Sequence, residues 1–246
     1  MEIITSLEQL HSFAAPCVVA LGTFDGLHRG HLDVIGTAKQ EAEHTGAKLA
    51  VFTFSNHPLE WINPAHVPVA LVTPAVKLQL LENLGVDVLI DIPFNQLVAD
   101  LLPQQFLERL SALNYSCLVV GENFTYGQRG MGNVYTLAAS AQALGFKLIV
   151  RKLVSNNGTI ISSTEIRRLI TAGEVQQAAK MLGRSYSISG IVAHGNERGR
   201  LLGYPTANLE LVDAHVAIPL GGVYAVRAYV DGGVYGGMAN IGKNPT

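Results

Sequence analysis

Hydrophobic positions in the first two thirds of the chain alternate between two patterns. Short apolar runs that end in glycine or polar residues indicate buried strands of a parallel sheet. Between them, apolar residues recur every three or four positions, which is the spacing of an amphipathic helix. The predicted strands are 16–22, 48–54, 86–90, 118–121 and 146–150, and the predicted helices are about 28–44, a stretch ending at 84, 103–113 and 134–144.

Strands separated by helices of this length need crossover connections, so we predict an α/β domain with a doubly wound parallel sheet. Two further helical stretches, 162–170 and 174–182, are predicted to link it to the last part of the chain. After Gly183 the pattern becomes strand-like, and no long helical pattern remains. We therefore predict an α/β domain over 1–183, including the linker helices, and an all-β domain over 184–246. Its expected strands are 186–192, 223–230 and 234–241, the last two joined by a hairpin turn at Asp231-Gly232-Gly233.

Composition narrows the class of protein. Hydrophobic residues make up 48% of the 246 residues, charged residues 15%, and the formal net charge is -2. Without a basic stripe, a nucleic-acid partner is not expected. No apolar run approaches the ~20 residues that cross a bilayer, and the N-terminus does not resemble a signal peptide. Cys17 and Cys117 begin apolar runs and are expected to be buried free thiols, so we predict a cytoplasmic protein without a membrane partner.

The segment from Gly22 to His31, GTFDGLHRGH, joins a predicted strand to a predicted helix. A helix N-terminus presents free backbone N–H groups, which suit a phosphate. His28 and His31 are three residues apart and share a helix face, so their imidazoles could donate to phosphate oxygens. The alternative is a helix start with two solvated histidines, and zinc is disfavoured because only one further ligand is near. The other candidate phosphate-binding residues in this segment are Gly22, Phe24, Asp25 and Gly30.

A second polar cluster lies in residues 161–167, ISSTEIR. Ser162 followed by Glu165 fits a capping box, which would explain the cluster as a well-capped helix. The functional interpretation is a helix N-terminus that holds the β- and γ-phosphates of a nucleotide. The residues alone leave both interpretations open. The two hydroxyls and the guanidinium group in question belong to Ser163, Thr164 and Arg167.

Together these motifs, about 130 residues apart, resemble the nucleotidylyltransferase superfamily and, within it, the bacterial FAD synthetase family. Two more segments carry the resemblance: Thr53–Pro58 (TFSNHP) and Gly121–Gly127 (GENFTYG). It implies a Rossmann-like domain that transfers AMP from ATP to FMN, giving FAD and pyrophosphate, with Mg²⁺ at the phosphates. The catalytic residues it implies are His28, His31 and Arg167. Ser162, Ser163, Thr164 and Asn123 are implied to bind the nucleotide, and Phe54, Asn56, Pro58, Phe124 and Tyr126 to bind the flavin.

A third candidate site is the glycine-rich segment His194–Asn208 of the β domain. On physical grounds alone a plain β loop is favoured, although hydroxyl and amide oxygens suit Mg²⁺. However, GYPTAN, the later GVY at 222–224 and NIGxxPT at 240–246 resemble the riboflavin kinase module of the same family. That resemblance implies a barrel-like β domain that takes riboflavin and ATP. The implied ATP and Mg²⁺ residues are Gly195, Gly199, Gly203, Thr206 and Asn208.

In that family the kinase module continues past the NIGxxPT segment and supplies a glutamate as general base, followed by a C-terminal helix. The sequence ends at Thr246, and neither Glu197 nor Glu210 matches the family's base position. We therefore expect a C-terminally truncated riboflavin kinase module: either the sequence is a fragment of a longer protein or this module is inactive.

Two other functions remain open. One is a nucleotidylyltransferase that acts on another phosphorylated cofactor precursor, such as a pantetheine or nicotinamide phosphate. The β domain argues against it, because those enzymes do not need one. The other is a non-catalytic flavin-binding protein, which the intact His28, His31 and Arg167 disfavour. The expected partners are small-molecule substrates, and the sequence does not indicate the oligomeric state.

Overall fold

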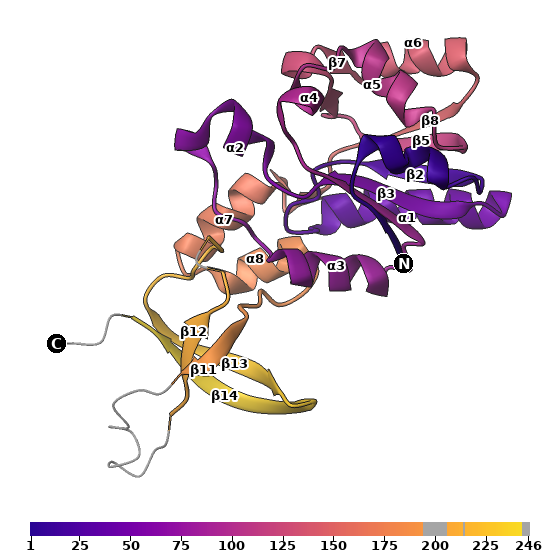
Figure 1. The fold of residues 1–246 in the computed structure, drawn as a ribbon. Helices are drawn as coiled ribbons and strands as arrows, with labels where there is room; N and C mark the ends of the chain where they lie inside the picture. The colour runs from indigo at the N-terminus through magenta and orange to yellow at the C-terminus, as the bar shows by residue number, and fades with distance from the viewer. Residues whose placement is uncertain (194–205, 214, 243–246) are drawn as a thin grey trace. The chain divides into compact units, whose positions relative to one another are not determined.

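The computed structural model of the chain describes residues 1–193, 206–213 and 215–242, in two compact units (Figure 1). The first unit consists of Met1–Pro68 and Pro74–Ser162, and the second of Val69–Thr73 and Ser163–Thr246. The division falls at Ser162, so the two linker helices belong with the second unit. Within the described residues, no helix is long and apolar enough to cross a membrane.

A six-stranded parallel sheet organises the first unit, as the sequence pattern predicts (Figure 1). Its strand order is β1-β4-β3-β2-β5-β8, and each neighbouring pair runs in parallel. The edge strand β1 was not predicted, because three residues are too few to show a pattern. The strands are β1 (Glu2–Ile4), β2 (Cys17–Leu21), β3 (Lys48–Phe54), β4 (Val88–Ile92), β5 (Tyr115–Gly121) and β8 (Lys147–Arg151).

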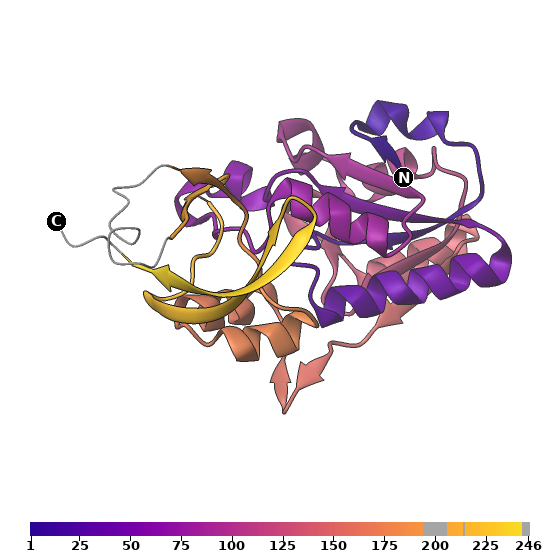
Figure 2. The same ribbon diagram turned by 90° about the horizontal axis from the view of Figure 1, so that it is seen from below.

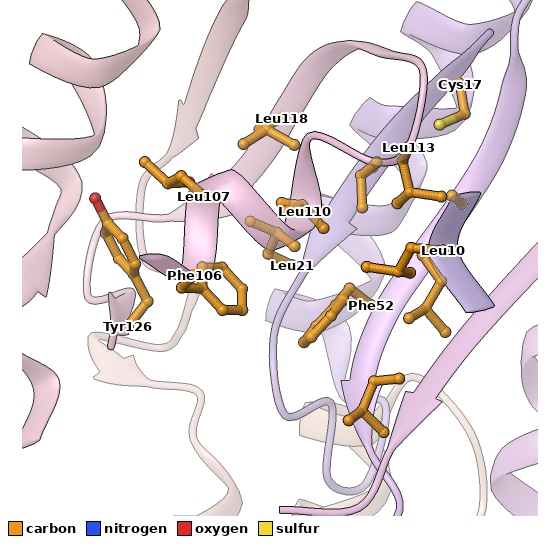
Figure 3. Packing of buried hydrophobic residues seen from close by; sticks show 14 of the residues in the cluster. Leu10, Cys17, Leu21, Phe52, Phe106, Leu107, Leu110, Leu113, Leu118 and Tyr126 are labelled. Atoms are coloured by element: carbon orange, nitrogen blue, oxygen red, sulfur yellow. The ribbon is translucent and has the colours of Figure 1, made fainter. Parts of the chain in front are cut away.

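Alternation along each strand divides the core between the two faces of the sheet. In β2, Val18 and Ala20 pack toward one face, whereas Val19 and Leu21 pack toward the other. The first face is covered by α1 (Arg29–Thr45) and α3 (Pro74–Asn83). The second is covered by η1 (Leu7–Ser12), α4 (Gln96–Ala99), α5 (Pro103–Leu110) and α6 (Val134–Leu144). Figure 3 shows the second face, where side chains of α5 meet Leu21 and Phe52.

Helix α1 has the features that the sequence predicts. Its buried side chains, Val34, Ile35, Ala38 and Ala42, lie along one stripe. Gly46 ends it with a φ of 67°, a left-handed conformation that glycine adopts without a steric penalty. Figure 2 shows α1 extended along the sheet.

The predicted strand at 86–90 is shifted: β4 begins at Val88. The reason lies at the end of α3, where the N–H of Val86 donates to Leu81 O and closes the helix. Val86 is therefore buried without being part of the ladder. Two elements of this region were not predicted, α2 (Pro58–Ile62) and η2 (Pro64–His66).

The second unit combines helices α7 (Ser163–Thr171) and α8 (Val175–Leu182) with antiparallel strands. Strands β13 (Gly222–Val230) and β14 (Gly233–Ile241) form the expected hairpin, with Val230 opposite Gly233. Its two turn residues, Asp231 and Gly232, have φ values of 49° and 77°, as a twist-matched two-residue turn requires.

The strand predicted at 186–192 starts too early. Strand β11 covers Gly190–Ala193, because its partner β12 (Asn208–Leu211) offers only four residues to pair with. Before it, the Tyr186 hydroxyl donates to Ala217 O at 2.6 Å instead of the backbone joining a ladder. Strand β12 was not predicted, and neither were four strands of two residues each: β6 (Thr125–Tyr126), β7 (Gly132–Asn133), β9 (Ser155–Asn156) and β10 (Thr159–Ile160). Cys17 and Cys117 are buried free thiols, as predicted.

Candidate active site

The strand order places most of the candidate residues at one edge of the sheet. From β2 the chain moves to β3 on one side, and it later returns to β5 on the other. In open α/β sheets, ligands bind beside such a reversal, at the carboxyl ends of the strands. The loops that come after β2, β3 and β5 carry residues 22–31, 54–58 and 123–126, so the first unit brings these three candidate groups to the same edge.

The loop after β2 is held in an unusual conformation by its own buried side chains. Phe24 and Leu27 have φ values of 48° and 42°, in the left-handed region that bulky residues rarely adopt. Both side chains are 1% exposed, so core packing offsets the strain. A Cβ at Gly22 would lie 2.9 Å from the Phe24 ring, which explains why glycine precedes it. The ring of Phe24 is therefore part of the core, and only the backbone of this residue could contact a nucleotide.

His28 is the N-cap of α1 rather than a residue inside the helix. Its Nδ1 accepts a hydrogen bond from the backbone N–H of His31 at 3.3 Å. A nitrogen that accepts carries no proton, so the neutral ring has its proton on Nε2. The cap thus fixes the tautomer of the neutral ring, with the N–H at Nε2, and His28 is only 6% exposed.

The His31 ring stacks on the His28 ring, with centroids 3.6 Å apart and an interplanar angle of 18°. The edge of Phe24 supports it from another side, at a centroid distance of 5.3 Å. Burial, together with the nearby His28 and Lys77, lowers the pKa of His31 well below its usual range. His31 is therefore a neutral imidazole at pH 7, and its Nδ1 is buried with no hydrogen-bond partner among the described residues.

This low pKa has a consequence for stability. In the unfolded chain the pKa of a histidine is about 6.5, so between that value and the lowered folded pKa the unfolded state binds more protons. We therefore expect the free energy of unfolding to decrease as the pH is lowered through this window. His31 contributes up to about 1.4 kcal/mol per pH unit to this decrease. Urea unfolding of the wild type and His31→Gln between about pH 7 and pH 5 checks this. The variant should lose less stability on acidification, and equal losses would contradict the neutral state of His31.

Gly30 lets the histidine pair sit against the start of the helix. A Cβ at this position would lie 3.1 Å from Cε1 and 3.2 Å from Nδ1 of the His28 ring. On the same side, the carbonyl oxygen of Ile161 is 4.0 Å from that Cβ position. The first residue of the ISST segment is thus adjacent to the His-x-Gly-His segment within the first unit, although about 130 residues separate them in sequence.

The predicted flavin residues Phe54 and Asn56 lie at the end of β3 and in the loop that follows it. The Asn56 side chain accepts from Phe94 N at 2.7 Å and donates to Phe94 O at 3.1 Å. This clamp ties the loop after β3 to the loop after β4 and sets Phe94 edge-on against Phe54, at a centroid distance of 5.0 Å. Pro58 begins α2, which His57 caps. Asn56 therefore shapes the aromatic surface, with its amide already engaged.

The loop after β5 supplies a second aromatic pair. Phe124 is half-buried and stacks on Tyr126 with centroids 5.8 Å apart. Tyr126 is 6% exposed and packs in the core, so Phe124 is the ring of this pair that a ligand could reach. Asn123 is exposed, and its Oδ1 lies 3.1 Å from the position that a Cβ at Gly121 would take.

The other phosphate candidates lie at the start of the second unit. Ser163 and Thr164 open α7, and Arg167 lies one turn later. The Arg167 Nε donates to Val69 O at 2.6 Å, which orients the guanidinium group. Both carboxylate oxygens of Glu165 bind Arg168, at 2.8 and 2.7 Å. The last candidate, Ser162, directly precedes α7 and belongs to the first unit.

Of the predicted kinase residues, Thr206 and Asn208 are described and exposed, and Asn208 opens β12 opposite Ala193. Gly195, Gly199 and Gly203 lie outside the described residues. Across residues 1–193, 206–213 and 215–242, no group of three or more His, Cys, Asp or Glu side chains could hold a metal ion. The hydroxyl and amide oxygens of Thr206 and Asn208 are hard donors, which fit Mg²⁺ that keeps most of its coordination from water and phosphate.

Sequence reasoning missed a polar network beneath the histidines. Lys77 of α3 donates to Thr53 Oγ1 at 2.8 Å, and Asp91 of β4 stands opposite Thr53 in the sheet register. A single lysine in a predicted helix looks like a solvated charge. Only the parallel register and the packing of α3 on the sheet place it in this network.

The parallel sheet, the loops at the strand reversal and the capped His-x-Gly-His helix start define an α/β domain of the nucleotidylyltransferase type, followed by a unit with antiparallel strands. Comparison with known families gives the narrower class. A model described as FAD synthetase matches residues 10–165, and one described as riboflavin kinase matches residues 182–246. The chain belongs to the FAD synthetase family.

Individual relatives agree with this assignment. A bifunctional riboflavin kinase/FMN adenylyltransferase from Bacillus subtilis is 44% identical over 94% of this chain and 73% of the relative. A protein of the same name from Haemophilus influenzae is 34% identical over 100% of this chain and 80% of the relative. A solved structure from Streptococcus pneumoniae, described as a macrolide-efflux protein, covers 99% of this chain and 79% of its own, with a TM-score of 0.91 and 33% identity.

Proposed function

We propose that the chain serves FAD biosynthesis, and that its α/β domain transfers AMP from ATP to FMN, releasing pyrophosphate. The observation that carries the proposal is the capped helix start, where His28 and His31 stack at the reversal of the strand order, in a chain of the FAD synthetase family. The two relatives named riboflavin kinase/FMN adenylyltransferase, from Bacillus subtilis and Haemophilus influenzae, support the same substrates. The domain division that goes with this proposal is 1–183 for adenylyl transfer and 184–246 for the kinase module, in a cytoplasmic protein.

The reaction needs no covalent intermediate. An oxygen of the FMN phosphate forms a bond to the α-phosphorus of ATP, and the bond from that phosphorus to the oxygen bridging to the β-phosphate breaks. Catalysis then consists of positioning and of stabilising negative charge on the phosphates. His28 would donate from Nε2, and the backbone at the start of α1 would offer its free N–H groups. We assign His31 to the same phosphates. Held neutral, it would also keep the stack in place without adding a positive charge of its own to a buried site.

We assign Ser163, Thr164 and Arg167 to the outgoing pyrophosphate, and Asn123 to the nucleotide. On the flavin side, Phe54 and Phe124 offer half-buried aromatic faces on which a flat ring system can stack. Asn56 and Pro58 would shape that surface, and Tyr126 would support Phe124 from the core. Mg²⁺, when bound, supplies charge neutralisation at the phosphates.

Replacing Arg167 with Lys should raise KM for ATP about ten-fold, because an ammonium group cannot grip two phosphate oxygens as the guanidinium fork does. The affinity for pyrophosphate in the reverse reaction should fall in parallel. Steady-state kinetics in both directions measures this. Arg168→Lys on the same helix is the matched control, since an exposed pair with Glu165 contributes little. Unchanged constants in Arg167→Lys would remove Arg167 from the site.

For the second domain we propose riboflavin phosphorylation by ATP where the full-length kinase module is present, supported by the riboflavin kinase match at residues 182–246. Thr206 and Asn208 would hold Mg²⁺ with ATP, and the glycines at 195, 199 and 203 would allow close approach of the backbone to phosphates.

A choice among acceptors tests the proposed adenylyl transfer. The chain is incubated with Mg-ATP and one acceptor at a time: FMN, 4′-phosphopantetheine or nicotinamide mononucleotide. We expect pyrophosphate release and a new dinucleotide with FMN alone. Turnover with one of the other acceptors instead would indicate a different nucleotidylyltransferase. Flavin binding without pyrophosphate release would indicate a non-catalytic flavin-binding protein.

A further inference from the structure

Lys77 places a charged ammonium group in a partly buried position, where loss of hydration disfavours the charge. It comes from the first turns of α3, on the face of the sheet that α1 also covers, and its side chain is half-buried. Its ammonium group donates to Thr53 Oγ1 at 2.8 Å and to Phe54 O at 3.1 Å. Both acceptors are uncharged and lie at the carboxyl end of β3, so Lys77 ties α3 to the edge of the sheet that carries the candidate site.

The hydrogen bond continues through Thr53 to the loop after β2. Thr53 is 0% exposed, and its hydroxyl donates to Thr23 O at 2.9 Å. Because the hydroxyl proton points to Thr23, the oxygen is left to accept from Lys77. The result is a directed relay from Lys77 through Thr53 to Thr23, which is the residue just before the strained Phe24.

The surroundings of Lys77 are charged on several sides. Asp91 stands opposite Thr53 in the register, and its Oδ1 is buried without a hydrogen-bond partner in the part of the chain that the structure describes. Burial lowers the pKa of Lys77, and Asp91 and Asp25 act in the opposite direction. The same ammonium group helps keep His31 neutral. Such a cluster of perturbed groups, at the edge where ligands bind, is typical of a functional site more than of a scaffold.

We propose that Lys77 is a positioning residue for the adenylyl transfer: through Thr53 it holds the 22–28 loop that sets His28 at the start of α1. The inference rests on the proposed function. The loop has left-handed residues on either side of Asp25, at Phe24 and Leu27. The buried side chains of Phe24 and Leu27 hold the later part of the loop. The relay ends on its first part, at Thr23 O. Without this hydrogen bond the loop could shift, and His28 would shift with it. A misplacement of ~1 Å typically lowers the rate on the order of a hundred-fold.

Two variants of Thr53 test the relay directly. Thr53→Val keeps the shape of the side chain but removes the hydroxyl, while Lys77 and its charge remain. We expect kcat for FAD formation to fall between about ten-fold and a hundred-fold, with a smaller change in KM for FMN. Thr53→Ser restores the hydroxyl and should recover most of the lost rate. Lys77→Met should lower kcat at least as much as Thr53→Val.

Lys48→Met is the matched control, since Lys48 lies at the opposite end of β3 in an exposed pair with Asp87. It should leave kcat unchanged. If Thr53→Val is as active as the wild type while Lys77→Met is impaired, the charge of Lys77 acts without the relay and the proposal is overturned. Equal losses in Thr53→Val and Thr53→Ser would overturn it as well, because they would reflect packing.

Amide hydrogen exchange of the peptide that spans residues 22–28 separates this proposal from the proposed function. Thr53→Val and Lys77→Met should speed exchange there, and Thr53→Ser and Lys48→Met should not. If exchange is faster in Thr53→Val and Lys77→Met but the wild-type protein makes no FAD, the relay is kept and the proposed function is rejected. Unchanged exchange, with an active wild type, would reject the relay alone.

Discussion

Replacing His28 with Asn should lower the rate of FAD formation by a hundred-fold to a thousand-fold while the fold persists. Asparagine is a good N-cap, because its side-chain oxygen can accept the helix N–H that His28 Nδ1 accepts now. It lacks the Nε2–H donor, and losing one such donor typically costs ~3 kcal/mol of transition-state stabilisation. The rate is measured with saturating FMN and ATP, and the fold by thermal unfolding.

Two further variants separate the cap from the chemistry. His28→Ala loses both the capping acceptor and the Nε2–H donor. It should therefore be about 1 kcal/mol less stable than His28→Asn and no more active. His44→Asn changes an exposed histidine in the last turn of the same helix and should leave the rate alone. Near-normal turnover in His28→Asn would reduce His28 to a capping residue.

A glycine pair in α1 gives the second large effect. Gly30→Ala should lower kcat by about ten-fold to a hundred-fold, because the new methyl group would lie 3.1 Å from the His28 ring and displace it. The ring is buried and stacked on His31, so its displacement would also disturb the histidine pair. The effect should appear in kcat, with the fold retained.

Gly36→Ala is the internal comparison, because the added Cβ meets no atom within 4 Å. In a helix interior this change should stabilise the protein by up to about 1 kcal/mol and leave the rate unchanged. Both changes add one methyl group to α1, but only the group at position 30 meets the His28 ring. Equal activity of Gly30→Ala and Gly36→Ala would show that the position of the His28 ring is not critical.

The parallel sheet was predictable because its central strands are buried on both faces. β2 and β3 appear as continuous apolar runs, and the helices between them show regular apolar stripes. The β13–β14 hairpin was predictable from Asp231-Gly232, a dipeptide that tolerates positive φ at both positions. Asn157-Gly158 carries the same signal, and it connects β9 and β10. That hairpin was overlooked because its strands have only two residues each.

The candidate site was predictable only as residue types, since packing decides how each side chain is used. The sequence predicts Phe24 and Asn56 as ligand-binding residues. In the structure, the Phe24 ring is buried in the core, and the Asn56 amide is hydrogen-bonded to the backbone of Phe94. The role of Lys77 depends on the register between Thr53 and Asp91 and on the approach of α3. Contacts between strands that are distant in sequence leave no periodic signal along the chain.

The fate of the ATP phosphates shows whether AMP passes from ATP to FMN. The chain is supplied with FMN and Mg-ATP labelled either at the α-phosphate or at the γ-phosphate, and the products are separated by chromatography. The expected result is α-label in FAD and γ-label in pyrophosphate. The proposed transfer would be contradicted if the α-label were absent from FAD and stayed in ATP, ADP or free AMP.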